Sequence, residues 1–399
     1  MNFNFSEEET AFRQEVRDFI KKEVPPDFRG ADVCTQWQEE AIDDLHSFAN
    51  VMRRKLGAKG WLGMTWPKEY GGQDASFTKE YILADELTYN KVPGRDIYGI
   101  TMIGPTILKL GTEAQKKKFL GEITRGEVVW CEGMSEPEAG SDLASLRTRA
   151  VLDGDEFVVN GEKIWSSGAH VADWYILFVR TDPDAPNNKG ISCLLVDLKN
   201  TPGITFQTIQ HMDGLFAFNS VFLDDVRVPK ENLLGELNGG FKVLLELLNF
   251  ERPFGGLAAI YARRIMDDLL EYAKETKRNG VLLVKDPIIR SRFAELATEL
   301  EVGRMIINKV MWNQSRGQTI PIESTMVKLF GINVSRHVYN FGMQLLGLHG
   351  QLDEGSKWAP LHGQMVYLYL SSLGLLSAGG TTEVLKNTVA GVGLNMPRG

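Results

Sequence analysis

A glutamate lies in line with an apolar helical stripe in the segment LLELLNFERPFGG, residues 244–256. The residues seven, four and three positions before Glu251 are Leu244, Leu247 and Leu248, and this spacing puts all four side chains on one face of a helix. An ionised carboxylate is costly to bury without a partner. A carboxyl group in an apolar, partly closed pocket is also what a general base near neutral pH requires.

The residues that follow Glu251 predict an opening of this helix. Pro253 removes a backbone N–H and clashes with the preceding turn, so we expect a kink. Gly255 and Gly256 leave room for a ligand or for another helix. Arg252 lies about 100° away around the helix and does not pair naturally with Glu251. From this stretch alone, a catalytic base and a structural ion pair with another arginine are equally favoured.

Two segments in the middle of the chain have the composition of ligand-binding loops. MSEPEAGSDLAS (134–145) offers successive backbone N–H groups, a hydroxyl group and little steric bulk, which suits a phosphate or a planar polar ring. KIWSSGAH (163–170) puts Trp165 and two serines at the end of an expected strand. Core packing is the commoner role for such a tryptophan.

Two glycine-rich segments near the end of the chain have similar features. AGGTTEVLKN (378–387) is a glycine turn that opens a helix with Thr381 or Thr382 as its cap, so its first N–H groups are free to meet an electron-rich ligand. QLLGLHGQL (344–352) is another glycine-punctuated segment between helices. The spacing of these segments does not identify the ligand.

Hydrophobic periodicity predicts an α+β multidomain protein with three parts. They are an N-terminal α-helical domain (1–127), a middle antiparallel β-sandwich or barrel domain (128–236) and a C-terminal bundle of four or five helices (237–399). Strands are expected at 156–165, 174–182, 190–198, 203–209 and 220–228. Long helices are expected at 241–278, 287–316, 321–346 and 364–376, with a last one from 382.

Three local signals refine this outline. Ser6 and Thr112 precede helical patterns and are expected to be N-caps. The dipeptide Asn160-Gly161 predicts a hairpin turn.

The composition excludes several classes of protein. The chain has 399 residues, a net charge of −8 and no basic block, which argues against a nucleic-acid binder. Its six histidines and three cysteines show no metal-ligand or redox spacing, so no metal site is expected, and the odd cysteine count fits a reducing compartment. The first residues are acidic and lack a cationic start with an apolar core, so no targeting segment is expected, and no apolar run approaches membrane-spanning length. We therefore expect a soluble, cytoplasmic protein without a membrane span.

Four motifs together resemble the acyl-CoA dehydrogenase family of flavoproteins over nearly the whole chain. They are MSEPEAGSD, NGEKIWSSGAHVADWYILFVRTD, VFLDDVRVPKENLLGE and GGTTEVLKN. The resemblance implies the same order of helical, β and four-helix-bundle domains and a tetrameric assembly. It also implies FAD as cofactor, an acyl-CoA thioester as substrate and an electron-transferring flavoprotein as electron acceptor. In that reaction a glutamate removes the α-proton, the flavin takes the β-hydrogen as hydride, and hydrogen bonds to the thioester carbonyl stabilise the enolate.

The resemblance also implies roles for individual residues. Met134, Ser135, Gly140 and Ser141 are expected against the flavin and its phosphates, and Trp165 and Ser167 beside the isoalloxazine ring. Thr381 and Glu383 are expected to open the last helix beside the cofactor, and Gln344 to reach the far end of the cofactor of a neighbouring subunit.

One departure from the family pattern concerns the base. Many family members carry it just before the glycine-threonine turn, where this chain has Gly379, which has no side chain. A second arrangement places the glutamate on the first long bundle helix, in a context that LLNFERP resembles. Glu251 is therefore the expected base, and the backbone N–H of Gly379 is an expected hydrogen-bond donor to the thioester carbonyl.

A second departure lies in AKETKRNGVLLVKDPIIR, residues 273–290. Most family members have an arginine and a phenylalanine-glycine pair here that grip the pyrophosphate and adenine of the adjacent subunit's cofactor. Arg278 is near the position of the family's arginine, but it does not have the spacing of the family motif. The variant resembles bacterial branches that act on steroid side chains or other bulky acyl-CoAs, some of which are heterotetramers with fewer flavins than subunits. The sequence does not distinguish a homotetramer from a heterotetramer.

Two alternatives to the dehydrogenase remain. The same fold serves flavin oxidases and monooxygenases, because a fold does not determine the chemistry. A non-catalytic partner subunit of a heteromeric dehydrogenase is the other alternative, although a glutamate at a base position argues against it. Gly379, Gly255 and Gly256 also suggest a roomy acyl pocket, unless the space beside them is taken by a neighbouring side chain.

Overall fold

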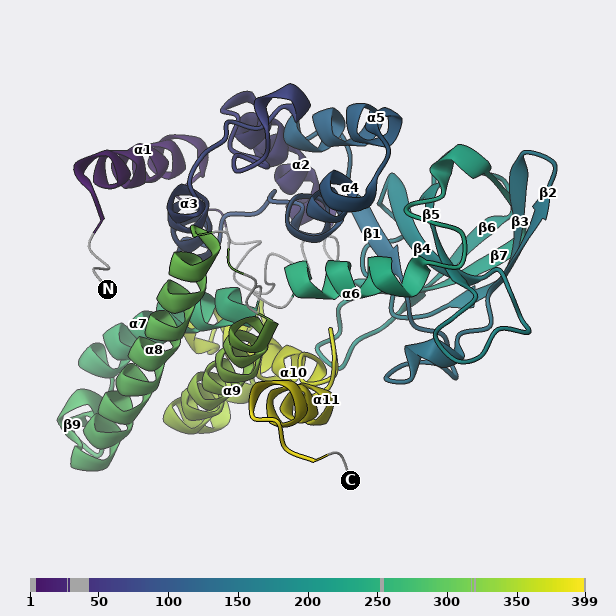
Figure 1. The fold of residues 1–399 in the computed structure, drawn as a ribbon. Helices are drawn as coiled ribbons and strands as arrows, with labels where there is room; N and C mark the ends of the chain where they lie inside the picture. The colour runs from purple at the N-terminus through teal and green to yellow at the C-terminus, as the bar shows by residue number, and fades with distance from the viewer. Residues whose placement is uncertain are drawn as a thin grey trace. The chain divides into compact units, whose positions relative to one another are not determined.

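The computed structural model describes residues 5–26, 28, 43–251, 255–316, 318 and 321–397. They divide into two compact units that draw on separate stretches of the chain (Figure 1). The helical unit takes its described residues from the ranges 1–35, 76–92 and 252–399, and the sheet unit from 36–75 and 93–251.

In its described residues, the sheet unit combines four α-helices with a seven-stranded sheet. Its helices are α2 (Asp43–Ala58), α4 (Gly104–Leu110), α5 (Glu113–Thr124) and α6 (Gly240–Glu251). Thr112 caps α5 in a reciprocal capping box with Gln115, as the sequence predicts. The strands are β1 (Trp130–Gly133), β2 (Arg149–Asp153), β3 (Glu156–Lys163), β4 (Trp174–Arg180), β5 (Ile191–Asp197), β6 (Ile204–Ile209) and β7 (Phe218–Pro229).

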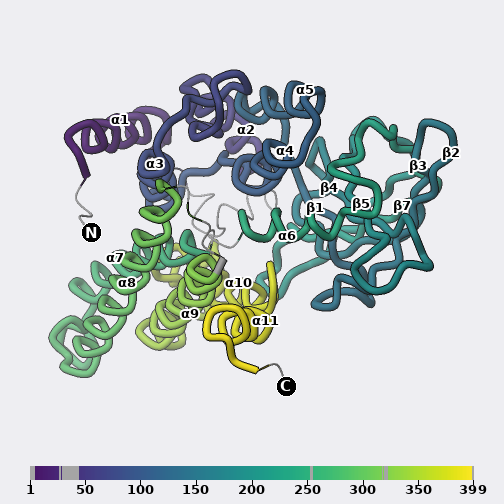
Figure 2. The backbone as a smooth tube through the Cα atoms, in the orientation of Figure 1, coloured from purple at the N-terminus to yellow at the C-terminus, as the bar shows by residue number. Residues whose placement is uncertain are grey.

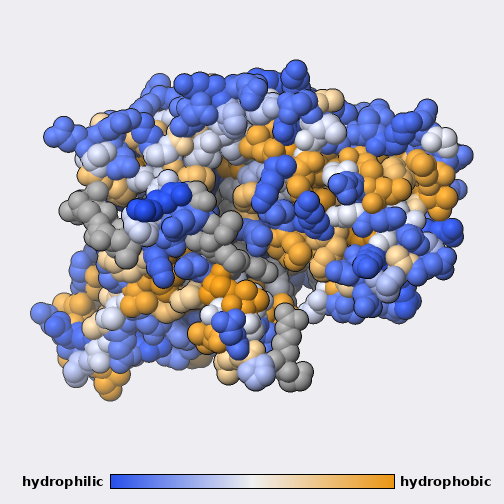
Figure 3. Space-filling view, viewed as in Figure 1, coloured by the Kyte–Doolittle hydropathy of each residue, from blue (hydrophilic) through white to orange (hydrophobic). Residues whose placement is uncertain are grey.

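The sheet runs in the order β1-β4-β2-β3-β7-β6, and β5 pairs with β4 outside this path. Four pairings are antiparallel: β2–β3, β3–β7, β4–β5 and β6–β7. The sheet is nevertheless mixed, because β4 pairs parallel with β1 and, at one residue, with β2. Alternating side chains of β3, β4, β5 and β7 build one buried core. The space-filling view shows apolar patches over the strands (Figure 3). The exposed apolar side chains of β2, β6 and β7 include Val151, Leu152, Phe206 and Phe222.

The predicted hairpin at Asn160-Gly161 is wrong. Both residues lie inside β3, and the register with β7 shifts between Val159 and Gly161, which marks a β-bulge. Gly161 has φ 152°, and a Cβ atom there would lie 2.7 Å from Thr148 Oγ1. The glycine therefore serves a close backbone approach within a strand, and the β2–β3 hairpin turns at Gly154 instead (φ 63°).

The helical unit contains α1, α3 and the helices that follow residue 254. Ser6 caps α1 in a capping box with Glu9, as predicted. The α-helices are α1 (Glu7–Glu23), α3 (Phe77–Tyr89), α7 (Gly255–Glu275), α8 (Pro287–Gln314), α9 (Pro321–Leu346), α10 (Gln364–Gly374) and α11 (Thr382–Thr388). A two-stranded hairpin, β8 (Lys277–Arg278) with β9 (Val281–Leu282), joins α7 to α8.

Helices α7, α8, α9 and α10 pack around one apolar core, and their backbones run beside one another in the tube view (Figure 2). Leu269 of α7, Leu296 of α8, Val338 of α9 and Leu368 of α10 are all buried in it. This four-helix core, together with the sheet core, confirms the predicted fold class.

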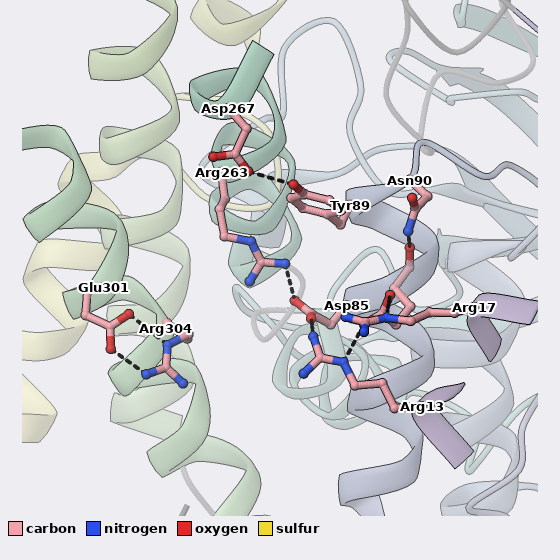
Figure 4. Close-up of polar contacts among 10 residues, drawn as sticks. Arg13, Arg17, Asp85, Tyr89, Asn90, Arg263, Asp267, Glu301 and Arg304 are labelled. Carbon is pink, nitrogen blue, oxygen red and sulfur yellow. Dashed lines mark hydrogen bonds and ion pairs between the residues drawn. The ribbon is translucent and has the colours of Figure 1, made fainter. Parts of the chain in front are cut away.

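A network of charged side chains joins α1, α3 and α7 within the helical unit (Figure 4). Arg13 of α1 bonds both Asp85 (3.1 Å) and Glu86 of α3, and Arg17 bonds Glu86 at 3.0 Å. Arg263 of α7 reaches the other oxygen of Asp85 at 3.0 Å. Burial raises the pKa of Asp85, although Arg263 and Arg13 favour its charged form. Burial would also raise the pKa of Glu86, but hydrogen bonds from Arg17 and Arg13 outweigh it and lower that pKa.

Some classes of site have no counterpart in the part of the chain that the structure describes. Within it, no helix combines the length and apolar content needed to cross a bilayer. In the same residues, no group of three or more histidine, cysteine, aspartate or glutamate side chains is placed to hold a metal ion. Cys131 and Cys193 are buried, and Cys34 lies outside the described residues.

Candidate active site

Glu251 is the last residue of α6 and ends the apolar face that the sequence predicts. Leu244 and Leu247 are buried, and Leu248 is half-buried. The side chain of Glu251 is also half-buried, and its Oε2 atom is buried without a hydrogen-bond partner among the described residues. A buried, unpaired carboxylate oxygen carries a desolvation cost that a proton or a donor would relieve.

Two contacts inside the sheet unit hold α6 in place. Its first residue, Gly240, lies so close to β5 that a Cβ atom there would come within 2.6 Å of the Ser192 carbonyl carbon. One turn before Glu251, Glu246 accepts a hydrogen bond from Lys109 of α4 at 2.7 Å. The position of the glutamate thus depends on the sheet and on α4.

The kink predicted at Pro253 falls between α6 and α7 and stays a prediction. Helix α6 ends at Glu251 and α7 begins at Gly255. Arg252 and Pro253 lie outside the described residues.

The space beside Gly255 and Gly256 is filled by neighbouring helices of the helical unit. A Cβ atom on Gly255 would lie 2.2 Å from the Cα atom of Lys328 in α9, and one on Gly256 would lie 3.1 Å from Ile307 of α8. These glycines therefore allow close helix packing, and the suggestion that they enlarge an acyl pocket is wrong.

A buried ion pair organises the loop that contains Met134 and Ser135. Lys163, at the end of β3, is fully buried, and its Nζ atom donates to the Met134 carbonyl oxygen (3.0 Å) and to Glu136 Oε1 (2.8 Å). Glu136 also accepts from the backbone N–H groups of Thr148 (2.8 Å) and Arg147 (2.6 Å). One lysine and one glutamate thus fix the path of the loop.

The pKa values of this pair reflect the competition between burial and attraction. Burial lowers the pKa of Lys163 to about 8, although Glu136 favours its charged form. Burial would raise the pKa of Glu136, but Lys163 and the hydrogen bonds that Glu136 accepts outweigh it and lower that pKa. Neither residue stands out in the motif, but the period-two pattern of β3 places Lys163 on the same face as buried Phe157 and Val159, and this signal predicts a buried lysine.

The outer part of this loop is exposed. A backbone hydrogen bond from Ile164 to the Ser135 carbonyl oxygen (2.9 Å) joins the loop to the segment after β3. Gly140 and Ser141 lie at the exposed end, and a Cβ atom on Gly140 would meet no other atom within 4 Å. The sequence-predicted residues Met134, Ser135, Gly140 and Ser141 therefore share one loop, with its outer part open to a ligand.

The turn after β3 presents Trp165 to solvent. Trp165 has φ 64° and is 55% exposed, and its ring packs edge-on against Phe218 (centroids 5.9 Å apart). Core packing is therefore not its role within the described chain. Ser167 is buried in the same turn, and the Ser166 hydroxyl shares a hydrogen bond with the Tyr175 hydroxyl at 2.7 Å.

Asn219 holds this turn from below and was not singled out by the sequence. Its Nδ2 atom donates to the Ser166 carbonyl oxygen (3.0 Å), and its backbone carbonyl oxygen accepts from the backbone N–H of Ser166 (3.1 Å). Its Oδ1 atom is buried without a partner among the described residues. No local sequence signal marks it, because the contact links residues 53 positions apart.

The helical unit contains the other predicted site residues. Thr381 caps α11 by accepting a hydrogen bond from Val384 N–H at 3.3 Å, and Glu383 is exposed in the first turn. Gly379 and Gly380 form the turn before it, with φ values of 58° and 97° that favour glycine.

Gln344 is exposed near the end of α9, next to a contact that involves Arg278. The guanidinium of Arg278, in β8, donates to the carbonyl oxygen of Leu345 at 2.8 Å. Arg278 therefore completes the end of α9 through a backbone carbonyl.

Three family models match consecutive parts of the chain. The N-terminal, middle and C-terminal domains of acyl-CoA dehydrogenase match residues 6–127, 131–226 and 238–394. The chain belongs to the acyl-CoA dehydrogenase family. Members of this family are oxidoreductases and flavoproteins.

Individual relatives cover the chain end to end. It is 32% identical to the acyl-CoA dehydrogenase FadE26 and 33% identical to FadE29, both of Mycobacterium tuberculosis, over 100% of this chain and 99% of each relative. Among solved structures, it is similar to the "Tcur3481-Tcur3483 steroid ACAD" (34% identity, TM-score 0.90) and to the ChsE4-ChsE5 complex from Mycobacterium tuberculosis (31% identity, TM-score 0.87). Both matches cover 100% of each chain.

The residues of the sheet unit fit the flavin that an acyl-CoA dehydrogenase carries. The loop around Gly140 offers an exposed, unobstructed backbone with a serine hydroxyl, and Trp165 offers an exposed aromatic face held by a buried scaffold. Exposed N–H groups suit phosphates and polar ring edges, and an aromatic face suits a planar ring.

Proposed function

We propose that the protein catalyses FAD-dependent α,β-dehydrogenation of an acyl-CoA thioester, with Glu251 removing the α-proton. Membership of the acyl-CoA dehydrogenase family supports the reaction class. The observation that carries the assignment of the base is the buried Oε2 atom of Glu251, which has no hydrogen-bond partner among the described residues and lies at the end of an apolar helix face. Gly379, at the other position that family members use for the base, has no side chain.

The chain's own residues divide the remaining work. The backbone N–H of Gly379 donates to the thioester carbonyl and stabilises the charge that develops on its oxygen. We assign the binding of FAD to Met134, Ser135, Gly140, Ser141, Trp165, Ser167, Thr381 and Glu383. Gln344 reaches the FAD of a neighbouring subunit. FAD, when bound, accepts the β-hydrogen as hydride. We assign the domains to residues 1–127, 128–236 and 237–399.

Anaerobic reduction of the bound flavin by a panel of acyl-CoAs tests the proposal. The wild-type protein is expected to bleach with at least one of them. Glu251→Gln is expected to reduce the bleaching rate by at least about 100-fold, because the neutral amide cannot accept the proton. Glu69→Gln, at an exposed glutamate of the sheet unit outside α6, is the matched control and should bleach at close to the wild-type rate.

Three outcomes would contradict the proposal. Full-rate bleaching by Glu251→Gln would remove Glu251 from the mechanism. Substrate-dependent formation of peroxide in air, without need of a protein acceptor, would favour a flavin oxidase or monooxygenase. A purified protein without a flavin spectrum, even after incubation with FAD, would favour a non-catalytic partner subunit.

We propose bulky acyl groups, such as branched, cyclic or steroid-like chains, as the substrate class. The support comes from relatives: one similar structure is described as a steroid ACAD. The panel should therefore contain steroid side-chain acyl-CoAs beside straight-chain ones. Faster bleaching by the straight chains would contradict this part of the proposal.

We propose an electron-transferring flavoprotein as the electron acceptor and the cytoplasm as the site of action. Substrate-dependent reduction of a purified electron-transferring flavoprotein is the direct test of the acceptor. Transfer no faster than direct reaction with oxygen would exclude it.

A further inference from the structure

Lys328 is a buried lysine in the first half of α9. Only 6% of its surface is exposed, whereas lysine is almost never buried without a partner. Its Nζ atom donates a hydrogen bond to the carbonyl oxygen of Ala378, 50 residues further along the chain. An ammonium group therefore lies against the turn that contains Gly379 and Gly380.

The backbone of α9 at Lys328 is held by direct contact with the start of α7. A Cβ atom on Gly255 would lie 2.2 Å from the Cα atom of Lys328. One turn later, a Cβ atom on Gly331 would lie 2.0 Å from the carbonyl oxygen of Gly255. The two helices touch through their backbones, so Lys328 projects from a site with little freedom to shift.

The carbonyl that Lys328 contacts belongs to the same peptide unit as the N–H of Gly379. In a planar trans peptide, the C=O of Ala378 and the N–H of Gly379 point in opposite directions. A cationic donor on the oxygen makes a strong, charge-assisted hydrogen bond and polarises the amide, which makes its N–H a better donor. The φ values of 58° and 97° at Gly379 and Gly380 set the rest of the turn.

We propose that Lys328 is a positioning residue that orients and polarises the Ala378–Gly379 peptide, so that the Gly379 N–H stabilises the enolate oxygen of the acyl-CoA. The inference rests on the proposed function, in which that N–H is the carbonyl donor. The charge of Lys328 acts through the peptide unit and does not touch the substrate. Its effect is therefore expected on the enolate more than on the neutral thioester.

A non-oxidisable substrate analogue isolates this effect. In a 3-thia-acyl-CoA the sulfur at C3 prevents dehydrogenation, and the acidic α-proton lets the bound analogue form an enolate, which absorbs at long wavelength beside oxidised flavin. The pH at which half of the bound analogue is enolate is expected to rise by about one to two units in Lys328→Met, and the rate of flavin reduction to fall about 10- to 100-fold. Lys328→Arg, which keeps a cationic donor, is expected to stay close to the wild type in both measurements.

Lys91→Met is the matched control for the loss of a buried lysine. Lys91 belongs to the same unit and bonds Gln364 at 2.8 Å and Asp268 at 3.6 Å. The Lys91→Met substitution is expected to lower thermal stability without changing the pH at which half of the bound analogue is enolate. If the Lys328→Met protein does not retain flavin, Lys328→Gln, which keeps a donor but not the charge, takes its place.

The outcomes separate this inference from the proposed function. The inference alone would be overturned by a Lys328 variant that lacks the charge, is folded and loaded with flavin, and still enolises the analogue as the wild type does. An equal shift in Lys91→Met would also overturn it, since the effect would then be one of general packing. A wild-type protein that neither enolises the analogue nor bleaches with any acyl-CoA would overturn the proposed function, and this inference with it.

Discussion

Lys163 carries its ammonium group into the interior of the sheet unit, where it has no contact with solvent. Because burial disfavours the charged form, its pKa is lowered to about 8 in the folded protein. In the unfolded chain lysine titrates near its ordinary value of about 10.4. Between these two values the unfolded chain binds more protons, so the contribution of Lys163 to the free energy of unfolding rises with pH in that window.

A pH-dependent comparison with Lys163→Met tests this sign. Between about pH 7 and about pH 9.5, we expect the free energy of unfolding of the wild type to increase relative to the variant by on the order of 1–2 kcal/mol. Urea unfolding at the two pH values provides the measurement. Lys230→Met is the control, because its hydrogen bond to Asp155 raises the pKa of Lys230 and keeps it charged across the window. A difference that is flat or falling with pH would contradict the prediction.

At the residue scale, local signals were predictable and long-range partners were not. Ser6, Thr112 and either Thr381 or Thr382 were expected as helix caps, because a cap depends on the next three residues, and the structure has Thr381 as the third cap. Lys163 depends on Glu136, and Lys328 on Ala378, so no window of sequence contains either pair. The roles of Glu251 and Gly379 stay predictions, drawn from the family resemblance and, for Glu251, also from its place on the apolar face of α6.

At the scale of elements, the contact between α7 and α9 predicts the effect of one methyl group. Gly255→Ala would place its Cβ atom 2.2 Å from the Cα atom of Lys328, and backbone cannot move aside cheaply. We expect a loss of about 1–3 kcal/mol in the free energy of unfolding, measured by chemical denaturation. Gly374→Ala, at the end of α10, is the matched control, because a Cβ atom there would meet no other atom within 4 Å. This variant should have an unchanged or slightly higher free energy of unfolding. Equal stabilities of the two variants would show that the helices can separate freely.

The anchoring of α1 on α3 gives a second prediction at this scale. Glu86 has a lowered pKa, so its contribution to stability is present above its ordinary titration range and is lost as the pH falls. Glu86→Gln at neutral pH removes the charge that Arg13 and Arg17 share (Figure 4). We expect amide hydrogen exchange in α1 to become faster by a factor of about 5. The factor is modest because both arginines are partly exposed and solvent screens their charges. Asp18→Asn, on the exposed side of α1, should leave exchange unchanged, and an equal effect of both variants would contradict the prediction.

The strands show where pattern reading succeeds and where it fails. The five expected strands agree with β3 to β7 to within a few residues, because their apolar alternation and turn residues are local. Strands β1 and β2 were missed, since β1 has four residues and β2 is mostly exposed. The Asn160-Gly161 turn was wrong because glycine serves a bulge as readily as a turn, and only the approach of Thr148 decides between them.

At the scale of the whole molecule, assembly is the open question that residues 273–290 raise. Two similar solved structures carry two protein names each, the Tcur3481-Tcur3483 steroid ACAD and the ChsE4-ChsE5 complex. In this chain Arg278 is engaged with the carbonyl oxygen of Leu345. We propose that the chain offers a poor adenine site to its neighbour and that a heteromeric partner supplies the missing contacts.

The flavin content of the protein purified alone tests this proposal. Fewer than one FAD per chain is expected, with a rise in FAD per assembly once a partner chain is co-expressed. Native mass spectrometry reports both the subunit composition and the bound cofactor. A homotetramer with one FAD in every subunit would contradict the proposal.

The division of the helical unit into three stretches of chain has a consequence for biosynthesis. The whole segment 93–251 leaves the ribosome between α3 and the helices that cover it, and the Asp85–Arg263 pair spans 178 positions. The sheet unit can therefore complete its contacts while the apolar side of α3 still waits for its partners. An uncovered apolar helix on a nascent chain invites aggregation and chaperone capture, so slower translation of the last third should lower the yield of this protein in the cell.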